Sequence, residues 1–185
     1  ISEIADLPVY EGNKPEKLCN LFKIEESPAE TPNILIEGDA GQVRRIGLGM
    51  KTGDIVINGN AGMHLGDKMA GGKITVNGDT GGWTGSDMKK GLIEIHGNAG
   101  DYLASPYRGS STGMKGGKII VDGNVGSDSA CYLHGGLIKI KGNSGAFLGF
   151  HMSDGVIQVQ NNSAPRIGAG MTGGKIVVLG QVQEV

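Results

Sequence analysis

Between Ile36 and the end of the chain, apolar residues recur in short alternating runs, and nearly every run ends at a glycine. An isoleucine stands four residues before this closing position, and an isoleucine or valine stands two residues before it. These pairs are Ile55/Ile57, Ile74/Val76, Ile93/Ile95, Ile119/Val121, Ile138/Ile140, Ile157/Val159 and Ile176/Val178. Alternation with a period of two is typical of a strand that buries one face, so each pair predicts one β-strand.

The predicted strands return at a nearly constant spacing. The closing positions are Gly38, Gly59, Gly78, Gly97, Gly123, Gly142, Asn161 and Gly180, with spacings of 21, 19, 19, 26, 19, 19 and 19 residues. A period of 19 residues with two insertions describes every step. Nine residues before the later closing positions stand Met50, Met69, Met88, Met114, Leu133, Met152 and Met171.

A repeat of this length is too short for a propeller blade and contains no helical stretch. It fits one coil of a β-solenoid, in which stacked coils place like residues on like and build a continuous aliphatic core. The sequence therefore predicts an all-β fold, a right-handed parallel β-helix of about seven 19-residue coils. Glycine and Asx residues are expected to supply corners with positive φ.

The first 35 residues have a different composition. Residues 1–35 contain only one glycine, four of the six prolines, and seven acidic against three basic residues, whereas residues 36–185 hold the other 34 glycines. We therefore expect two parts: an N-terminal extension or adaptor over 1–35, which caps one end of the solenoid or binds elsewhere, and a glycine-rich β-helix domain over 36–185.

Composition and charge exclude several classes of protein. The 35 glycines do not recur at every third residue, which excludes collagen, and 38% of the chain is apolar, which excludes a flexible linker. With 17 basic and 19 acidic residues, the chain shows no charge pattern for nucleic acid or anionic lipid. No apolar run is long enough to span a membrane and no signal peptide opens the chain, which starts at Ile1 without an initiator methionine, so a targeting segment can have been lost.

Motifs for cofactors and metals are weak in this sequence. The GxGxxG pattern of Gly168, Gly170 and Gly173 coincides with solenoid corners and has no helix after it. Cys19 and Cys131 form no CxxC motif, which favours a reducing, cytoplasmic location. We expect no catalytic, cofactor-binding or metal-binding residue on this chain.

Histidines and carboxylates are scattered over the predicted coils. The four histidines, His64, His96, His134 and His151, all stand at different positions of the repeat, so no two lie in one column of equivalent positions on successive coils. Only His134 and His151 stand on successive coils at positions from which both could approach one metal ion. A polysaccharide-active β-helix would need carboxylates that face each other across a groove, and the acidic residues form no such column.

Two features suggest an interface. The column five residues after the closing position contains His64, Trp83, Tyr102, Asp128, Phe147 and Arg166. Alternation directs it outward, where aromatic and arginine side chains are typical interface anchors, unless the N-terminal segment covers them. An insertion between Ala104 and Met114 is either a docking loop or a tolerated surface insertion. The interface candidates are Trp83, Tyr102, Tyr107, Arg108, Phe147 and Arg166.

The same repeats resemble a known family. The GxxGxxxG repeats from Gly38 to Gly180 are similar to the β-helix of the C subunit of formylmethanofuran dehydrogenase and of the C-terminal domain of glutamate synthase. The segments GNAGDYLASPYRGSSTGMKGG (97–117) and RRIGLGMKTGDIVINGNAG (44–62) most resemble the former.

This resemblance implies a non-catalytic scaffold subunit in the complex that reduces CO2 to formylmethanofuran in the first step of methanogenesis. It implies pterin-binding, amidohydrolase-like and iron–sulfur subunits as partners. Those subunits would hold a tungsten or molybdenum pterin, iron–sulfur clusters and a binuclear metal site. Two alternatives stay open: the C subunit of a bacterial formyltransferase/hydrolase complex, and the β-helix domain of a glutamate synthase.

Overall fold

The computed structural model describes residues 2–26 and 33–184. The chain divides into two compact units, Ile1–Thr31 and Pro32–Val185. Strand β3 of the second unit begins at Asn33, a little before the boundary predicted between residues 35 and 36. Each unit is described by itself.

The first unit is a small hairpin with two short helices. Its elements are α1 (Ser2–Ala5), β1 (Pro8–Glu11), β2 (Lys14–Lys17) and α2 (Leu18–Leu21). Strands β1 and β2 pair antiparallel around Gly12, whose φ of 61° suits a tight turn. No helix in the described part of the chain is long and apolar enough to cross a membrane.

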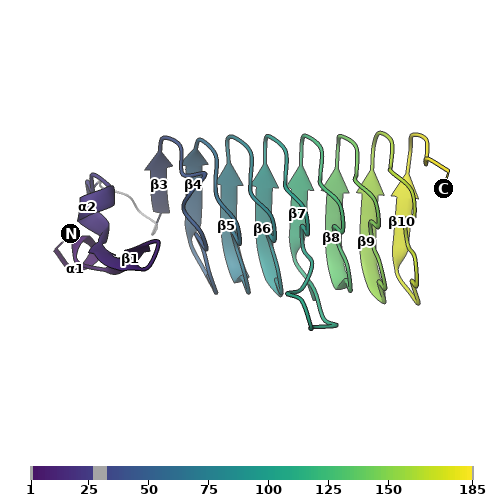
Figure 1. Ribbon diagram of the computed structural model, residues 1–185, viewed down its shortest axis with the longest axis horizontal. Helices are drawn as coiled ribbons and strands as arrows, with labels where there is room; N and C mark the ends of the chain where they lie inside the picture. Colours follow the sequence, from purple (N-terminus) through teal and green to yellow (C-terminus); the bar gives the residue numbers. More distant parts are fainter. Residues whose placement is uncertain (1, 27–32, 185) are drawn as a thin grey trace. The chain divides into compact units, whose positions relative to one another are not determined.

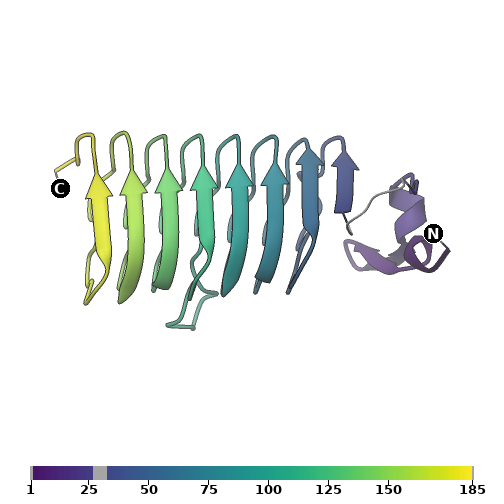
Figure 2. The ribbon, with the colours of Figure 1, turned by 180° about the vertical axis from the view of Figure 1, so that it is seen from behind.

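The second unit is a parallel β-solenoid, as the sequence predicts. One sheet contains β3 (Asn33–Glu37), β4 (Asp54–Asn58), β5 (Ala70–Val76), β6 (Lys90–Ile95), β7 (Lys118–Val121), β8 (His134–Ile140), β9 (Asp154–Val159) and β10 (Lys175–Val178). The strands lie in chain order, and all neighbours are parallel (Figures 1 and 2). The sheet has eight strands for about seven predicted repeats because the run before Gly38 also forms a strand.

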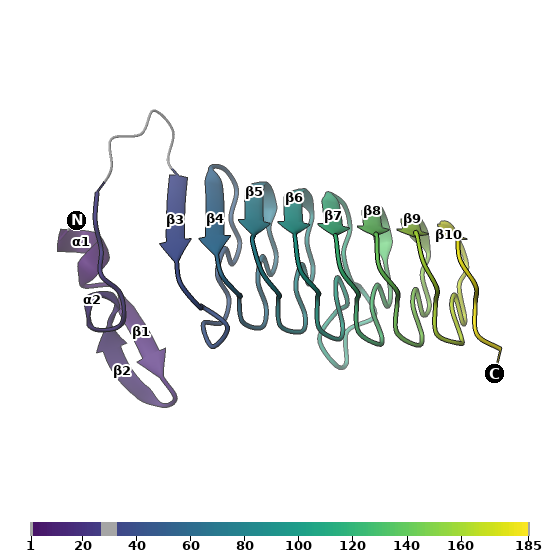
Figure 3. The same cartoon turned by 90° about the horizontal axis from the view of Figure 1, so that it is seen from above.

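The register of the sheet follows the repeat. Ile74 pairs with Ile55 on one side and with Ile93 on the other. A second ladder of single parallel bridges joins the returning segments, for example Thr80 with Ala61 and Ala99. The same coil shape is therefore repeated along β4 to β10 (Figure 3).

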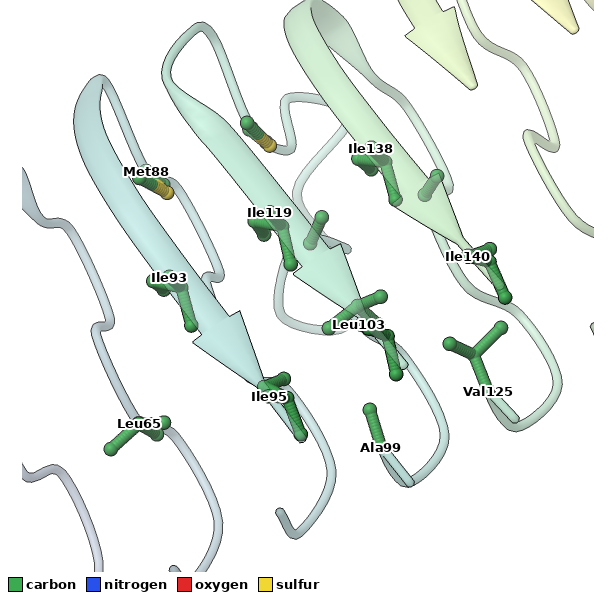
Figure 4. Packing of buried hydrophobic residues seen from close by; sticks show 14 of the residues in the cluster. Leu65, Met88, Ile93, Ile95, Ala99, Leu103, Ile119, Val125, Ile138 and Ile140 are labelled. Carbon is green, nitrogen blue, oxygen red and sulfur yellow. The ribbon is translucent and has the colours of Figure 1, made fainter. Parts of the chain in front are cut away.

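The core is the aliphatic interior of the coils. Met88, Ile93, Ile119 and Ile138 are fully buried, and side chains from successive coils lie in rows (Figure 4). Burying one such side chain contributes about 1.5–3 kcal/mol. The predicted isoleucine, valine and methionine columns are confirmed as this core.

The prediction of positive φ at the corners is confirmed for the glycines six residues before the closing positions but not for the Asx residues. These glycines are Gly53, Gly72, Gly91, Gly117, Gly136, Gly155 and Gly174. The closing glycines are needed mainly because adjacent backbones approach closely: a Cβ on Gly78 would lie 2.5 Å from the carbonyl oxygen of Gly59. None of the Asx residues that follow the closing positions has positive φ. From Asn60 to Asn162 they form a ladder instead, in which each Oδ1 accepts the backbone N–H of the equivalent residue in the next coil, as Asn98 does from Asn124 at 2.8 Å. Oδ1 of Asp39 accepts the N–H of Gly41 in its own turn. The prediction of positive φ was wrong for the Asx corners, because from Asn60 onward their role is this bond between coils.

Candidate functional site

The column that the sequence directs outward has an unusual backbone. Trp83, Tyr102, Asp128 and Phe147 have φ of 56°, 63°, 55° and 59°, in the left-handed region that side-chain-bearing residues usually avoid. The Tyr102 N–H donates forward to the carbonyl of Ser127, whereas the N–H of Ala104 donates back to the carbonyl of Thr84. Backbone N–H groups of this segment thus donate alternately to the following and to the preceding coil. These hydrogen bonds offset the cost of the left-handed conformation, which is about 1–2 kcal/mol per residue.

This backbone stacks aromatic rings from successive coils. The rings of Trp83 and Tyr102 lie 4.5 Å apart with an interplanar angle of 10°, and His64 stacks on the other side of Trp83 at 5.5 Å. These rings are half-buried, so they cover one another and are less exposed than predicted. Such pairs contribute about 0.5–1.5 kcal/mol beyond the area they bury.

The insertion folds back onto this stack. Pro106 is buried, and the ring of Tyr107 stacks on His64 at 5.1 Å, while Arg108 is exposed. The loop before β7 also extends past the row of coil turns (Figure 1). The insertion therefore combines a docked residue with an exposed tip, and the contact of Tyr107 with the ring stack was not predicted from the sequence.

Tyr107 is held by the buried carboxylate of Asp67, one of the acidic residues that form no column in the sequence. Its hydroxyl donates to Oδ2 of Asp67 at 2.7 Å and lies 3.2 Å from Nδ1 of His64. Asp67 is 2% exposed, and its Oδ1 has no hydrogen-bond partner among the described residues. The one sequence hint is that Asp67 stands in a column where the next coils have the small residues Ser86, Ser105 and Cys131.

The two ionisable rings of this cluster titrate abnormally. Burial first, and then the hydrogen bond to Asp67 and the charge of Asp67, together raise the pKa of Tyr107 to about 12, against a smaller opposing effect of Arg45. Burial lowers the pKa of His64, against the opposing charge of Asp67. Both shifts favour the neutral forms, so the cluster is an uncharged tyrosine and imidazole beside one carboxylate.

A second aromatic group follows on the later coils. The rings of Tyr132 and His151 stack at 5.3 Å, Phe150 meets His151 edge-on at 4.2 Å, and the Arg166 guanidinium lies 5.2 Å from the centre of the Phe147 ring. Phe147 and Arg166 are among the predicted interface candidates, whereas Tyr132 and Phe150 stand in other columns of the repeat and are not among those candidates.

Between the two aromatic groups lies a hollow of about 370 Å³. It is bordered by the insertion and by the rings of Tyr102, Tyr132 and Phe150. Asp128 also lines it, and burial, followed by the charge of Asp101, raises the pKa of the Asp128 carboxyl. Burial likewise raises the pKa of the Cys131 thiol in this hollow to about 11, so the thiol is protonated at neutral pH.

The outer face of the sheet carries a separate charged network. Lys73 pairs with Glu94 at 2.7 Å, and Asp122 pairs with both Lys141 at 2.7 Å and His96 at 2.9 Å. These hydrogen bonds, that from Lys141 first, lower the pKa of Asp122. Exposed pairs of this kind contribute about 0–1 kcal/mol each.

The histidines are used in packing. Nδ1 of His134 lies 2.7 Å from the carbonyl oxygen of Tyr132, and His151 stacks on the ring of the same tyrosine. Within residues 2–26 and 33–184, no group of three or more histidine, cysteine and acidic side chains could hold a metal ion.

Comparison with curated proteins supports the resemblance. No family model matches the chain. The chain is 47% identical over 66 residues to the C subunit of molybdenum-containing formylmethanofuran dehydrogenase 1 of Methanothermobacter thermautotrophicus, covering 36% of this chain and 16% of the relative. It is 44% identical over 69 residues to the C subunit of tungsten-containing formylmethanofuran dehydrogenase 2 of Methanothermobacter wolfeii, covering 36% and 26%. The matched region thus spans between a sixth and about a quarter of these relatives.

A solved structure matches nearly the whole chain. A chain in the crystal structure of the formyltransferase/hydrolase complex (FhcABCD) from Methylorubrum extorquens, in complex with methylofuran, has a TM-score of 0.90 at 26% identity. The match covers 98% of this chain and 68% of that chain. The predicted resemblance is confirmed: the chain is similar to the C subunit of the molybdenum and tungsten forms of formylmethanofuran dehydrogenase, and its solenoid is similar to a chain of a formyltransferase/hydrolase complex.

Proposed function

We propose that this chain is a non-catalytic scaffold subunit of a formylmethanofuran dehydrogenase, the complex that reduces CO2 to formylmethanofuran in methanogenesis. The observation that carries this proposal is the 43–47% identity to the C subunit of the molybdenum and tungsten forms. In this proposal the cytoplasmic complex holds its tungsten or molybdenum pterin, iron–sulfur clusters and binuclear metal site in other subunits.

The fold suits a scaffold. Hydrogen bonds link every coil to the next through the sheet and through the second ladder, and the core is continuous along the stack. A solenoid of this kind presents a long surface at nearly fixed geometry. Such a surface can hold large subunits in place without taking part in their chemistry.

The aromatic edge is the proposed docking surface for the pterin-binding and amidohydrolase-like subunits. Its contact residues are Trp83, Tyr102, Tyr107, Arg108, Phe147 and Arg166. Tryptophan, tyrosine and arginine dominate binding energy at many interfaces, and stacked rings lose little entropy on binding because they are already ordered.

A tagged chain purified from its native cells tests the proposal. We expect tungsten or molybdenum, iron and zinc to co-purify with it in stoichiometric amounts, together with formylmethanofuran dehydrogenase activity. The separated chain should have no such activity and bind no pterin. Activity of the isolated chain, or a purified complex without these metals, would contradict the proposal.

The second candidate is the β-helix subunit of a formyltransferase/hydrolase complex, which transfers and hydrolyses formyl groups without redox chemistry. The match over 98% of this chain at a TM-score of 0.90 favours it. The same purification separates the two candidates, because this complex would contain neither tungsten nor molybdenum and would show formyl transfer without CO2 reduction.

A further inference from the structure

The aromatic column of the solenoid is interrupted at one coil. Trp83 and Tyr102 stack on successive coils, but the next residue of the column is Asp128, and Phe147 follows one coil later. Trp83 covers one face of the Tyr102 ring. A carboxylate is too small to cover the other face, and the hollow of about 370 Å³ opens here, against Tyr102 and Asp128.

The chemistry of this hollow favours a cation. The aromatic side chains of Tyr102, Tyr132 and Phe150 line it, and Asp128 adds a carboxylate. Within the described residues, that carboxylate has neither an ion pair nor a hydrogen-bond partner. Aromatic rings attract a partly desolvated cation, and a nearby carboxylate adds to that attraction.

The column itself shows which cation fits. Two coils further on, the Arg166 guanidinium lies 5.2 Å from the centre of the ring of Phe147, the preceding residue of the column. The repeat thus places an arginine over the aromatic ring of the previous coil. At Tyr102 the equivalent position is occupied by Asp128, so a guanidinium there must come from elsewhere. A planar guanidinium can stack on a ring and form two hydrogen bonds to a carboxylate, which a lysine ammonium cannot do.

We propose that this hollow receives an arginine side chain of a partner subunit, which stacks on Tyr102 and pairs with Asp128. The inference rests on the proposed scaffold function, since it identifies the chemistry of one docking contact. The chain's own Arg108 also lines the hollow and is exposed. It is the competing occupant, and the experiment distinguishes the two.

Direct binding of a small probe tests the recognition without any partner. Trp83 is the single tryptophan of the chain and stacks on Tyr102, so its fluorescence reports events at this ring. The full chain is titrated with N-acetyl-L-arginine methylamide and with the neutral citrulline analogue of the same shape. We expect a saturable fluorescence change with the arginine probe, and binding at least about tenfold weaker for citrulline and for Asp128→Asn. Asp54→Asn, an exposed carboxylate on β4, is the matched control and should bind like the unmodified chain.

Three results would overturn the inference. Arginine and citrulline probes could bind equally, Asp128→Asn could bind as well as Asp54→Asn, or no saturable change could occur. The Arg108→Gln variant tests the competing occupant. If the arginine probe binds only to this variant, Arg108 fills the hollow in the unmodified chain and an arginine of a partner cannot enter it. Binding to the unmodified chain and to Arg108→Gln with similar affinity supports the proposal.

The same variants in the native complex separate this inference from the proposed function. We expect Asp128→Asn to lower the recovery of partner subunits about tenfold relative to Asp54→Asn. Equal recovery with both variants overturns the arginine contact even when tungsten or molybdenum co-purifies. Loss of those metals from the unmodified chain's complex instead contradicts the proposed function.

Discussion

The hydroxyl of Tyr107 donates a hydrogen bond to Oδ2 of Asp67 over 2.7 Å, although 40 residues separate the two in the chain. The bond joins the insertion of one coil to the buried carboxylate of an earlier coil. It partly satisfies an acidic side chain that is almost fully removed from solvent. The insertion is thereby tied to the stack of rings that we propose as a docking surface.

Replacing Tyr107 by phenylalanine removes this bond and retains the ring that stacks on His64. The Asp67 carboxylate then loses its only side-chain donor among the described residues, and leaving a buried polar group unsatisfied costs about 1–3 kcal/mol. We expect chemical denaturation to show a loss of this size for Tyr107→Phe. Tyr10→Phe, at a tyrosine that is 71% exposed, should leave the unfolding free energy unchanged. Equal stabilities of the two variants would contradict the role of the hydrogen bond.

The raised pKa of Tyr107 predicts a loss of stability at high pH. The pKa is about 12 in the folded chain and about 10 in the unfolded chain, so the folded state retains its proton longer. The associated stability is complete below about pH 10 and is lost as the pH rises toward 12. Absorbance of tyrosinate should show an ionisation near pH 12 in the unmodified chain that Tyr107→Phe lacks. A titration in which every tyrosine ionises near pH 10 would refute this.

Alanine substitutions at Gly78 and Gly85 should reduce folding stability by very different amounts. An alanine Cβ at Gly78 would lie 2.5 Å from the backbone oxygen of Gly59, which cannot move without separating the coils, so we expect a loss of more than about 3 kcal/mol or failure to fold. At Gly85 the Cβ would meet the flexible end of Ile119, and the same column already contains Ala104 and Ala130. Gly85→Ala should cost about 1 kcal/mol. Thermal unfolding of both variants checks this order, and similar losses would contradict it.

Asp128→Asn should stabilise the isolated chain at neutral pH. Burial raises the pKa of this carboxyl, so the folded state binds its proton more strongly than the unfolded state does. The protonated carboxyl therefore favours the folded state below the ordinary pKa of aspartate, and this stability is lost as the pH rises through the raised pKa. At neutral pH the charged carboxylate destabilises the fold. We expect a gain of about 0.5 kcal/mol at pH 7 that disappears at about pH 3. A variant that is less stable at pH 7 would show that the carboxylate has a partner in the folded chain.

This last prediction is opposite in sign to the binding prediction for the same residue. The asparagine should improve folding and weaken arginine binding, as is common where a site is maintained for recognition. Measuring both properties on one preparation distinguishes a binding role for Asp128 from a structural one.

The sequence by itself determined the solenoid. Stacked coils must place equivalent residues at equal spacing, so the recurrence of Ile74, Ile93 and Ile119 specifies parallel strands, their register and the buried face. The likeness to the C subunit of formylmethanofuran dehydrogenase was also visible in the repeats. The hairpin of the first unit was not predicted, because β1 and β2 are four residues each and largely exposed, without an alternating pattern.

Only the tertiary structure decided how the aromatic edge is built. Periodicity relates equivalent positions of successive coils, but the insertion has no equivalent, so nothing in the repeat specifies that Tyr107 reaches Asp67. The positive φ of Trp83 and Tyr102 could not be predicted from the sequence either, because bulky residues usually avoid this conformation. Only the hydrogen bonds to both neighbouring coils stabilise it. The hollow beside Asp128 depends on both the regular repeat and the irregular insertion. The regular repeat positions its walls, and the irregular insertion closes one side.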